Sequence, residues 1–60
     1  MNRQTAKTLY PDARLVRRVP QDNRFPVTYN VVDGESAISI TYPGTYYTPR
    51  EAWRAVKVPS

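Results

Sequence analysis

The sequence contains no cysteine and no histidine, only two glycines, and no long apolar run. It can therefore form no disulfide, and it lacks thiolate chemistry, the usual zinc ligands and the commonest general base. We expect no catalytic residues, no metal and no other cofactor. The longest apolar runs, such as residues 29–32, are far shorter than the ~20 residues of a membrane span. The first residues also lack the apolar segment of a signal peptide, so we expect a cytoplasmic protein without a membrane partner.

The chain has 60 residues and a formal net charge of +4. Residues 1–24 contain six arginine or lysine residues and two aspartates, whereas residues 25–60 contain three cations and three carboxylates. The whole basic excess therefore lies in the first part of the chain. This asymmetry favours a polyanionic partner, duplex DNA first, although a modest basic excess also occurs in small proteins that bind no nucleic acid.

The first 12 residues are polar and show no sustained period, which predicts a flexible basic arm that carries Arg3 and Lys7. Residues 13–60 then form a single small domain. Apolar and charged residues nearly alternate over residues 13–19, and residues 20–23 form a turn cluster. We therefore expect a first strand at residues 13–19.

Strict alternation predicts two further strands, over residues 25–32 and 38–42. Asp33-Gly34 between them is a favoured two-residue hairpin turn, which sets the register of the pair. This register brings apolar residues together on one face. The predicted cross-strand pairs are Val32 with Glu35, Tyr29 with Ile38, Val27 with Ile40, and Phe25 with Tyr42.

A short helix is predicted to follow at the C-terminal end. Thr48 is a good N-cap, Pro49 suits the first helical position, and Glu51 completes a capping box. Trp53 falls on the apolar side of this helix and is expected to cover the sheet. The predicted fold is thus α+β, with a three-stranded antiparallel sheet followed by one short helix packed on one sheet face.

The opposite face of the predicted sheet is polar and is the candidate nucleic-acid surface. It carries Thr28, Asn30, Ser39 and Thr41 and no acidic residue. The first strand adds arginines to its edge, and alternation puts Arg14 and Arg18 on one side and Arg17 on the other. Such a face suits a phosphate backbone, but an exposed antiparallel face is also often merely solvated by small polar residues.

Two segments resemble a known family of small DNA-binding domains. Residues 44–55, GTYYTPREAWRA, resemble the strand-to-helix signature G-T-F-x-T-x-x-E-A-x-R-A of plant Apetala-type transcription factors, and a looser form occurs in integrase arm-site-binding domains. Residues 14–18, RLVRR, are similar to the first strand of the same domains. The resemblance implies three strands and a helix over residues 14–56, with Arg14 and Arg17 contacting bases or phosphates.

Two hypotheses about function follow. The first is a small DNA-binding protein, encoded by a phage or mobile element, that binds duplex DNA through its sheet face and basic arm without catalysis. The second is a short phage-type inhibitor or adaptor that binds a host protein through three tyrosines, namely Tyr10, Tyr46 and Tyr47. Because the core is small and a sheet edge is open, both a monomer and a homodimer are compatible with the sequence.

Overall fold

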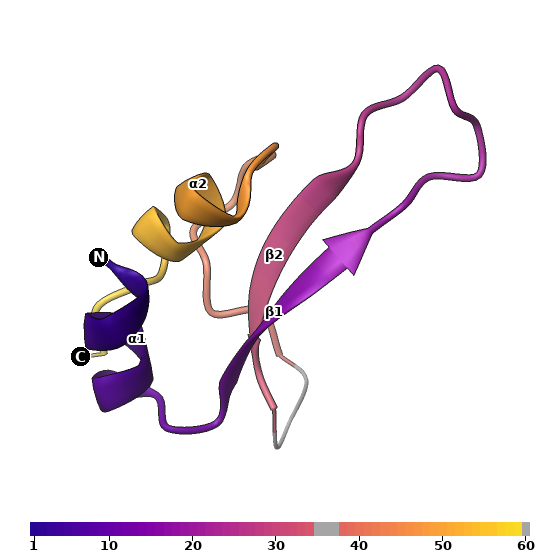
Figure 1. Cartoon of the computed structure of the whole chain (residues 1–60). Coiled ribbons are helices and arrows are strands. Elements are labelled where there is room, and N and C mark those ends of the chain that lie inside the picture. Colours follow the sequence, from indigo (N-terminus) through magenta and orange to yellow (C-terminus); the bar gives the residue numbers. More distant parts are fainter. Residues whose placement is uncertain (35–37, 60) are drawn as a thin grey trace.

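The structure, a computed structural model of the chain, describes residues 1–34 and 38–59. Its elements in chain order are α1 (Arg3–Leu9), β1 (Ala13–Arg18), β2 (Thr28–Asp33) and α2 (Pro49–Arg54). The two strands pair antiparallel into a ribbon, and both helices lie at one end of it, close to both termini (Figure 1). The loop of residues 19–27 joins the strands at the far end, and the molecule is 37 Å in its longest dimension.

The expectation of a three-stranded sheet followed by one helix is wrong. In the described ranges the sheet has two strands, and there are two helices. The segment expected to be the third strand divides its backbone hydrogen bonds between two neighbours. Ile40 donates to Val31 of β2 (3.0 Å), but Tyr42 donates to Ala55 after α2 (2.9 Å). Since neither neighbour pairs with the whole segment, only isolated bridges form.

The expected hairpin register is also wrong. Val32 lies opposite Ser39, and Tyr29 lies opposite Tyr46 rather than Ile38. Glu35, the predicted partner of Val32, lies outside the described residues. The backbone N–H of Gly34 donates to the Asp12 carbonyl (2.7 Å), so the end of β2 is held against the loop before β1. The pairing of Val32 with Ser39 therefore differs from the register that a two-residue Asp33-Gly34 turn would set.

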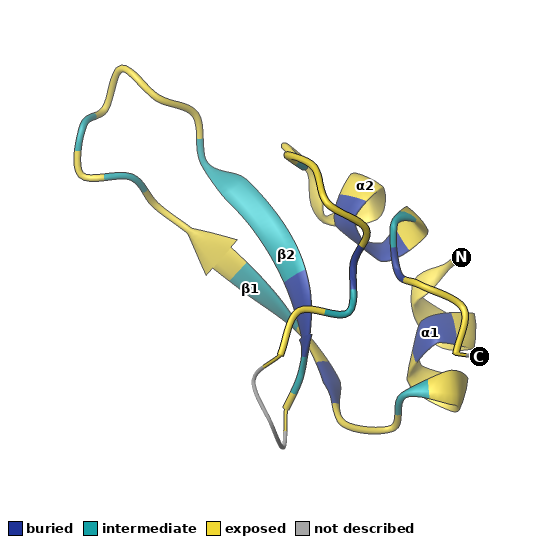
Figure 2. Ribbon diagram, turned by 180° about the vertical axis from the view of Figure 1, so that it is seen from behind, coloured by how far each residue is buried: buried dark blue, intermediate teal, exposed yellow. Residues whose placement is uncertain are grey.

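The core lies between the helices and the inner end of the ribbon (Figure 2). Three alanines at its centre allow the helices to approach the strands closely. The buried residues of this cluster are Ala6, Ala13, Val31, Ala52, Trp53 and Val56. Of the face predicted to be apolar, Tyr29 and Ile40 pack against the cluster, but Phe25, Ile38 and Tyr42 are exposed. Alternation identifies one side of a strand, but it does not say how far the helices cover it.

Helix α1 forms within residues 1–12, for which a flexible arm was expected. Asn2 caps it by accepting from the Thr5 N–H through Oδ1 (2.7 Å). Ala6 is its one buried residue, and the Tyr10 hydroxyl donates to the Lys57 carbonyl (2.8 Å). A helix that buries a single small side chain has no apolar stripe, which is why the sequence shows no helical period here.

Helix α2 begins where the sequence predicts. Thr48 is the N-cap, and its hydroxyl accepts from the Glu51 N–H (3.2 Å). The Glu51 carboxylate reaches back to the N–H of Tyr47 (3.0 Å), one residue before the cap. Trp53 is 6% exposed and belongs to the core, as predicted. Local capping chemistry is sufficient to position this helix because it depends on residues adjacent in sequence.

Candidate nucleic-acid interface

The pairing of β1 with β2 divides the strand arginines between the two faces of the ribbon. Arg14 lies opposite Val32 and Arg18 opposite Thr28, whereas Arg17 lies opposite Tyr29. Side chains alternate along a strand, so Arg14 and Arg18 share a face with Thr28 and Asn30, and Arg17 points to the other face. This is the division that alternation in the sequence predicts.

A groove lies on the Arg18 side of the ribbon and has a volume of about 460 Å³. We call it the polar groove. One wall comes from the outer parts of β1 and β2, and the other comes from the loop between residues 41 and 46 together with Lys57. Its lining residues are Arg18, Thr28, Tyr29, Asn30, Ser39, Thr41, Tyr42, Pro43, Gly44, Thr45, Tyr46 and Lys57.

Three polar side chains form a hydrogen-bonded cluster in the polar groove. The Asn30 Oδ1 accepts from the hydroxyls of Thr41 (2.6 Å) and Ser39 (3.1 Å) and from the Val31 N–H (3.0 Å). The two hydroxyls are also 3.0 Å apart. Asn30 thus lies on the edge of β2 at the point where the neighbouring segment separates from β2, after Thr41. The Val31 N–H fixes the carboxamide orientation, because an amide nitrogen could not accept its hydrogen bond.

Two tyrosines, Tyr42 and Tyr46, hold the far wall of the polar groove. The Tyr46 hydroxyl donates to the Tyr42 carbonyl (2.5 Å), which closes the intervening loop through Pro43 and Gly44. The Lys57 ammonium lies 6.0 Å from the centre of the Tyr42 ring, at the outer limit of a cation–π contact. Lys57 and Arg18 therefore place a cation on each wall of the groove.

The electrostatics of the polar groove are one-sided. No carboxylate is among its described lining residues, and within residues 1–34 and 38–59 Arg18 has no ion-pair partner. The ion pair found in the described chain lies in the outer loop, where Arg24 contacts Asp22 at 2.8 Å. The hydrogen bonds from Arg24 lower the pKa of Asp22, and Asp22 in turn raises the pKa of Arg24. The Arg24 charge is thus partly neutralised, whereas that of Arg18 faces solvent.

Of the other candidate residues, Tyr46 lines the polar groove and the rest lie outside it. Arg3 and Lys7 lie on α1, and Arg14 lies on β1 beyond the groove lining. The Tyr10 hydroxyl is used in a contact to the C-terminal segment. Tyr46 lines the groove and holds its wall, while Tyr47 is 53% exposed.

Sequence reasoning missed Lys57 and Tyr42 as groove residues. Lys57 joins the site because its N–H donates to the Ile40 carbonyl (2.8 Å), which places the segment after α2 beside residues 40–42. This contact joins residues far apart in sequence, and no local pattern indicates it. The available signal was weak: a lysine follows the helix, and a tyrosine precedes a Pro-Gly pair.

Comparisons with known proteins give no family for the chain: no family model matches it, and no curated protein or solved structure shows significant similarity. Over residues 1–34 and 38–59 no group of three or more acidic side chains is placed to hold a metal ion. The same residues include no helix with the length and apolar character that crossing a membrane requires. Functional interpretation therefore depends on the geometry and charge of the surfaces themselves.

Proposed function

We propose that the protein binds duplex DNA with the Arg18 face of the β1–β2 ribbon and without catalysis. The observation that carries the proposal is the polar groove, which has cations on both walls, a hydrogen-bonded polar cluster and no acidic lining residue. Arginine and lysine contact phosphates, and small polar side chains and amides contact sugar, phosphate and base edges. Arg14, on the same face, extends the basic surface along the strand.

The shape of the ribbon is compatible with this partner. A two-stranded antiparallel ribbon is narrow enough to enter the major groove of B-DNA. Each strand has six residues, which corresponds to about 20 Å at ~3.3 Å per residue. The outer ends of β1 and β2 and the loop that joins them project away from the helices, so this part of the ribbon is open to a duplex (Figure 1).

The test is a comparison of two adjacent arginines on opposite faces. Fluorescence anisotropy with a labelled duplex, from ~50 mM salt upward, gives the affinity and its salt dependence. We expect Arg18→Gln to weaken binding and to reduce the salt slope by about one unit. Arg17→Gln removes the same charge from the other face and should change both quantities less. Both side chains are exposed, so circular dichroism should show that both variants keep the parental fold.

Two results would contradict the proposal. One is a folded protein with no duplex binding at ~50 mM salt, where even non-specific binders are retained. The other is an equal effect of the two substitutions, which would show that binding depends on net charge rather than on the polar groove.

A second candidate function, binding to a host protein, is favoured by one surface. Val19, Phe25, Pro26 and Tyr47 are exposed and line a shared hollow of about 300 Å³ beside the outer ribbon. Exposed aromatic side chains that share a hollow are typical anchors of protein interfaces. If DNA binding fails, pull-down from a bacterial lysate treated with nuclease should capture a partner at high salt, and Tyr47→Ala should abolish the capture.

A further inference from the structure

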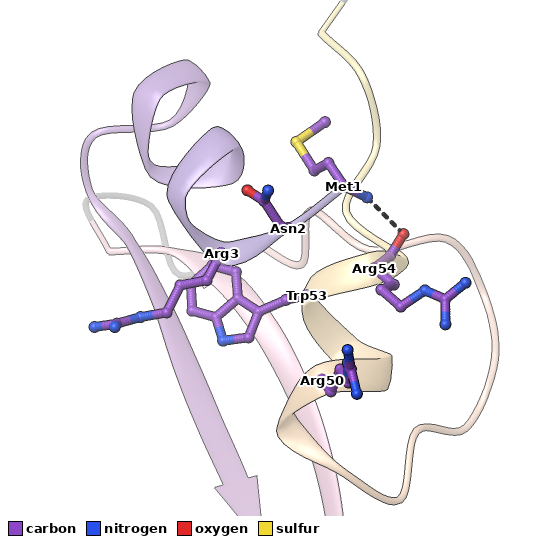
Figure 3. A pocket seen from close by; sticks show the side chains of 6 residues that line it. All are labelled: Met1, Asn2, Arg3, Arg50, Trp53 and Arg54. Atoms are coloured by element: carbon purple, nitrogen blue, oxygen red, sulfur yellow. Dashed lines mark hydrogen bonds between the residues drawn. The ribbon is translucent and has the colours of Figure 1, made fainter.

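A second hollow lies between the two helices and shares no lining residue with the polar groove. We call it the Trp53 hollow. It has a volume of about 430 Å³, within the range of small-molecule sites, and Figure 3 shows the side chains around it. Its lining residues are Met1, Asn2, Arg3, Arg50, Trp53 and Arg54.

Three arginines surround this hollow. Arg50 and Arg54 are one turn apart on α2, and Arg3 comes from α1. Like charges at this spacing on a helix repel one another. In the part of the chain that the structure describes, none of the three forms an ion pair. Glu51, the acidic residue of the same helix, directs its carboxylate to the Tyr47 N–H instead (3.0 Å). The three arginine charges that line the hollow are therefore unneutralised, which favours an anion.

Trp53 gives the hollow an apolar wall and an unused donor. Its indole lies between the side chains of Arg3 and Arg50 in Figure 3. In the described chain, the indole N–H of Trp53 forms no hydrogen bond. Every buried side-chain nitrogen there has a hydrogen-bond partner, so this N–H must reach the surface although the rest of Trp53 is buried. Tryptophan N–H groups usually find an acceptor when they are buried, and here a ligand can supply one.

We propose that the Trp53 hollow binds a small organic anion that combines a flat apolar ring with a phosphate or carboxylate group. The ring would lie against Met1 and the accessible edge of Trp53, and the anionic group would accept hydrogen bonds from the arginines, which match phosphate and carboxylate oxygens in bidentate geometry. This inference goes beyond the proposed DNA binding, because its residues belong to the two helices and not to the ribbon.

The chain carries its own reporter for this site, since Trp53 is the single tryptophan. The probe is phenyl phosphate, which has both required parts, and its two controls are inorganic phosphate and benzyl alcohol, which have one each. We expect phenyl phosphate to change the Trp53 fluorescence saturably, with at least about tenfold higher affinity than either control. The variant Arg50→Gln/Arg54→Gln should lose about tenfold or more of this affinity.

The matched control is Arg18→Gln, which removes a groove charge and should leave phenyl phosphate binding unchanged. This control separates the two proposals. Arg18→Gln should weaken DNA binding and leave phenyl phosphate binding unchanged, so either proposal can fail while the other holds. The inference is overturned if phenyl phosphate gives no saturable change, or if inorganic phosphate binds equally well. It is also overturned if the double variant folds and binds phenyl phosphate like the parent, or if only duplex DNA changes the fluorescence, which would assign these arginines to the DNA surface.

Discussion

The inner and outer ends of the ribbon differ in what their side chains do. At the inner end, Val31 of β2 is fully buried in the core, and Ala13 of β1 is almost so. At the outer end, Val19 and Phe25 are 65% and 63% exposed, and the loop of residues 19–27 is mostly open to solvent (Figure 2). Stability therefore depends on the inner end. The outer end is supported by strand pairing and can present polar and basic groups at little cost to the core.

Replacing one aromatic residue at each end should test this difference in stability most clearly. Trp53→Ala removes a buried indole and should cost ~3–5 kcal/mol, enough to unfold a domain of marginal stability. Phe25→Ala, at the outer end, should change the free energy of unfolding by less than ~0.5 kcal/mol. Urea denaturation followed by circular dichroism measures both. Equal losses would show that the outer end also belongs to the cooperative core.

The same division explains how much the sequence could predict. The cap of α2 at Thr48, the first strand and the burial of Trp53 depend on local or periodic signals, and the structure confirms them. The two-stranded sheet and the burial of Ala6 do not have such signals. Ala6 is buried because two short helices meet there, and a single alanine in a polar segment has no pattern that distinguishes a buried position from an exposed one.

The candidate site was predictable to a similar extent. Alternation placed Thr28 and Asn30 on one face of their strand and Arg18 on one side of the first strand, because side-chain direction follows from strand identity alone. The pairing that brings Arg18 opposite Thr28 comes from the structure. The opposite wall, with Tyr42 and Lys57, depends on where the chain goes after Thr41. That path is set by backbone hydrogen bonds to residues after α2, which are long-range contacts. Strand periodicity thus predicts a surface, whereas a groove requires the tertiary fold.

A smaller effect should come from the contact that holds the inner end of β2. A Cβ atom on Gly34 would lie 2.6 Å from the Asp12 carbonyl oxygen, a backbone atom that also accepts the Gly34 N–H. We expect Gly34→Ala to cost ~1–3 kcal/mol, or roughly 4 °C or more in Tm. Gly44 has a φ of +159°, which L residues rarely adopt, and an added Cβ would lie 3.1 Å from the Tyr46 hydroxyl, so Gly44→Ala should be strained for a different reason. Thermal melts in which Gly34→Ala leaves Tm unchanged would contradict this view of the inner end.

The smallest effect should come from the ion pair in the outer loop. The Arg24 hydrogen bonds lower the pKa of Asp22 in the folded chain, so any stabilisation from the pair is present above the unfolded-state pKa and is lost as the pH falls through the lower, folded value. Both side chains lie at the surface, where such pairs contribute little. We therefore expect Asp22→Asn to leave Tm unchanged at neutral pH. An NMR titration should find a depressed Asp22 midpoint that returns to the ordinary range in Arg24→Gln. A loss of Tm in Asp22→Asn comparable to that of Gly34→Ala would show that the outer loop stabilises the fold, and the contrast between the two ends would then fail.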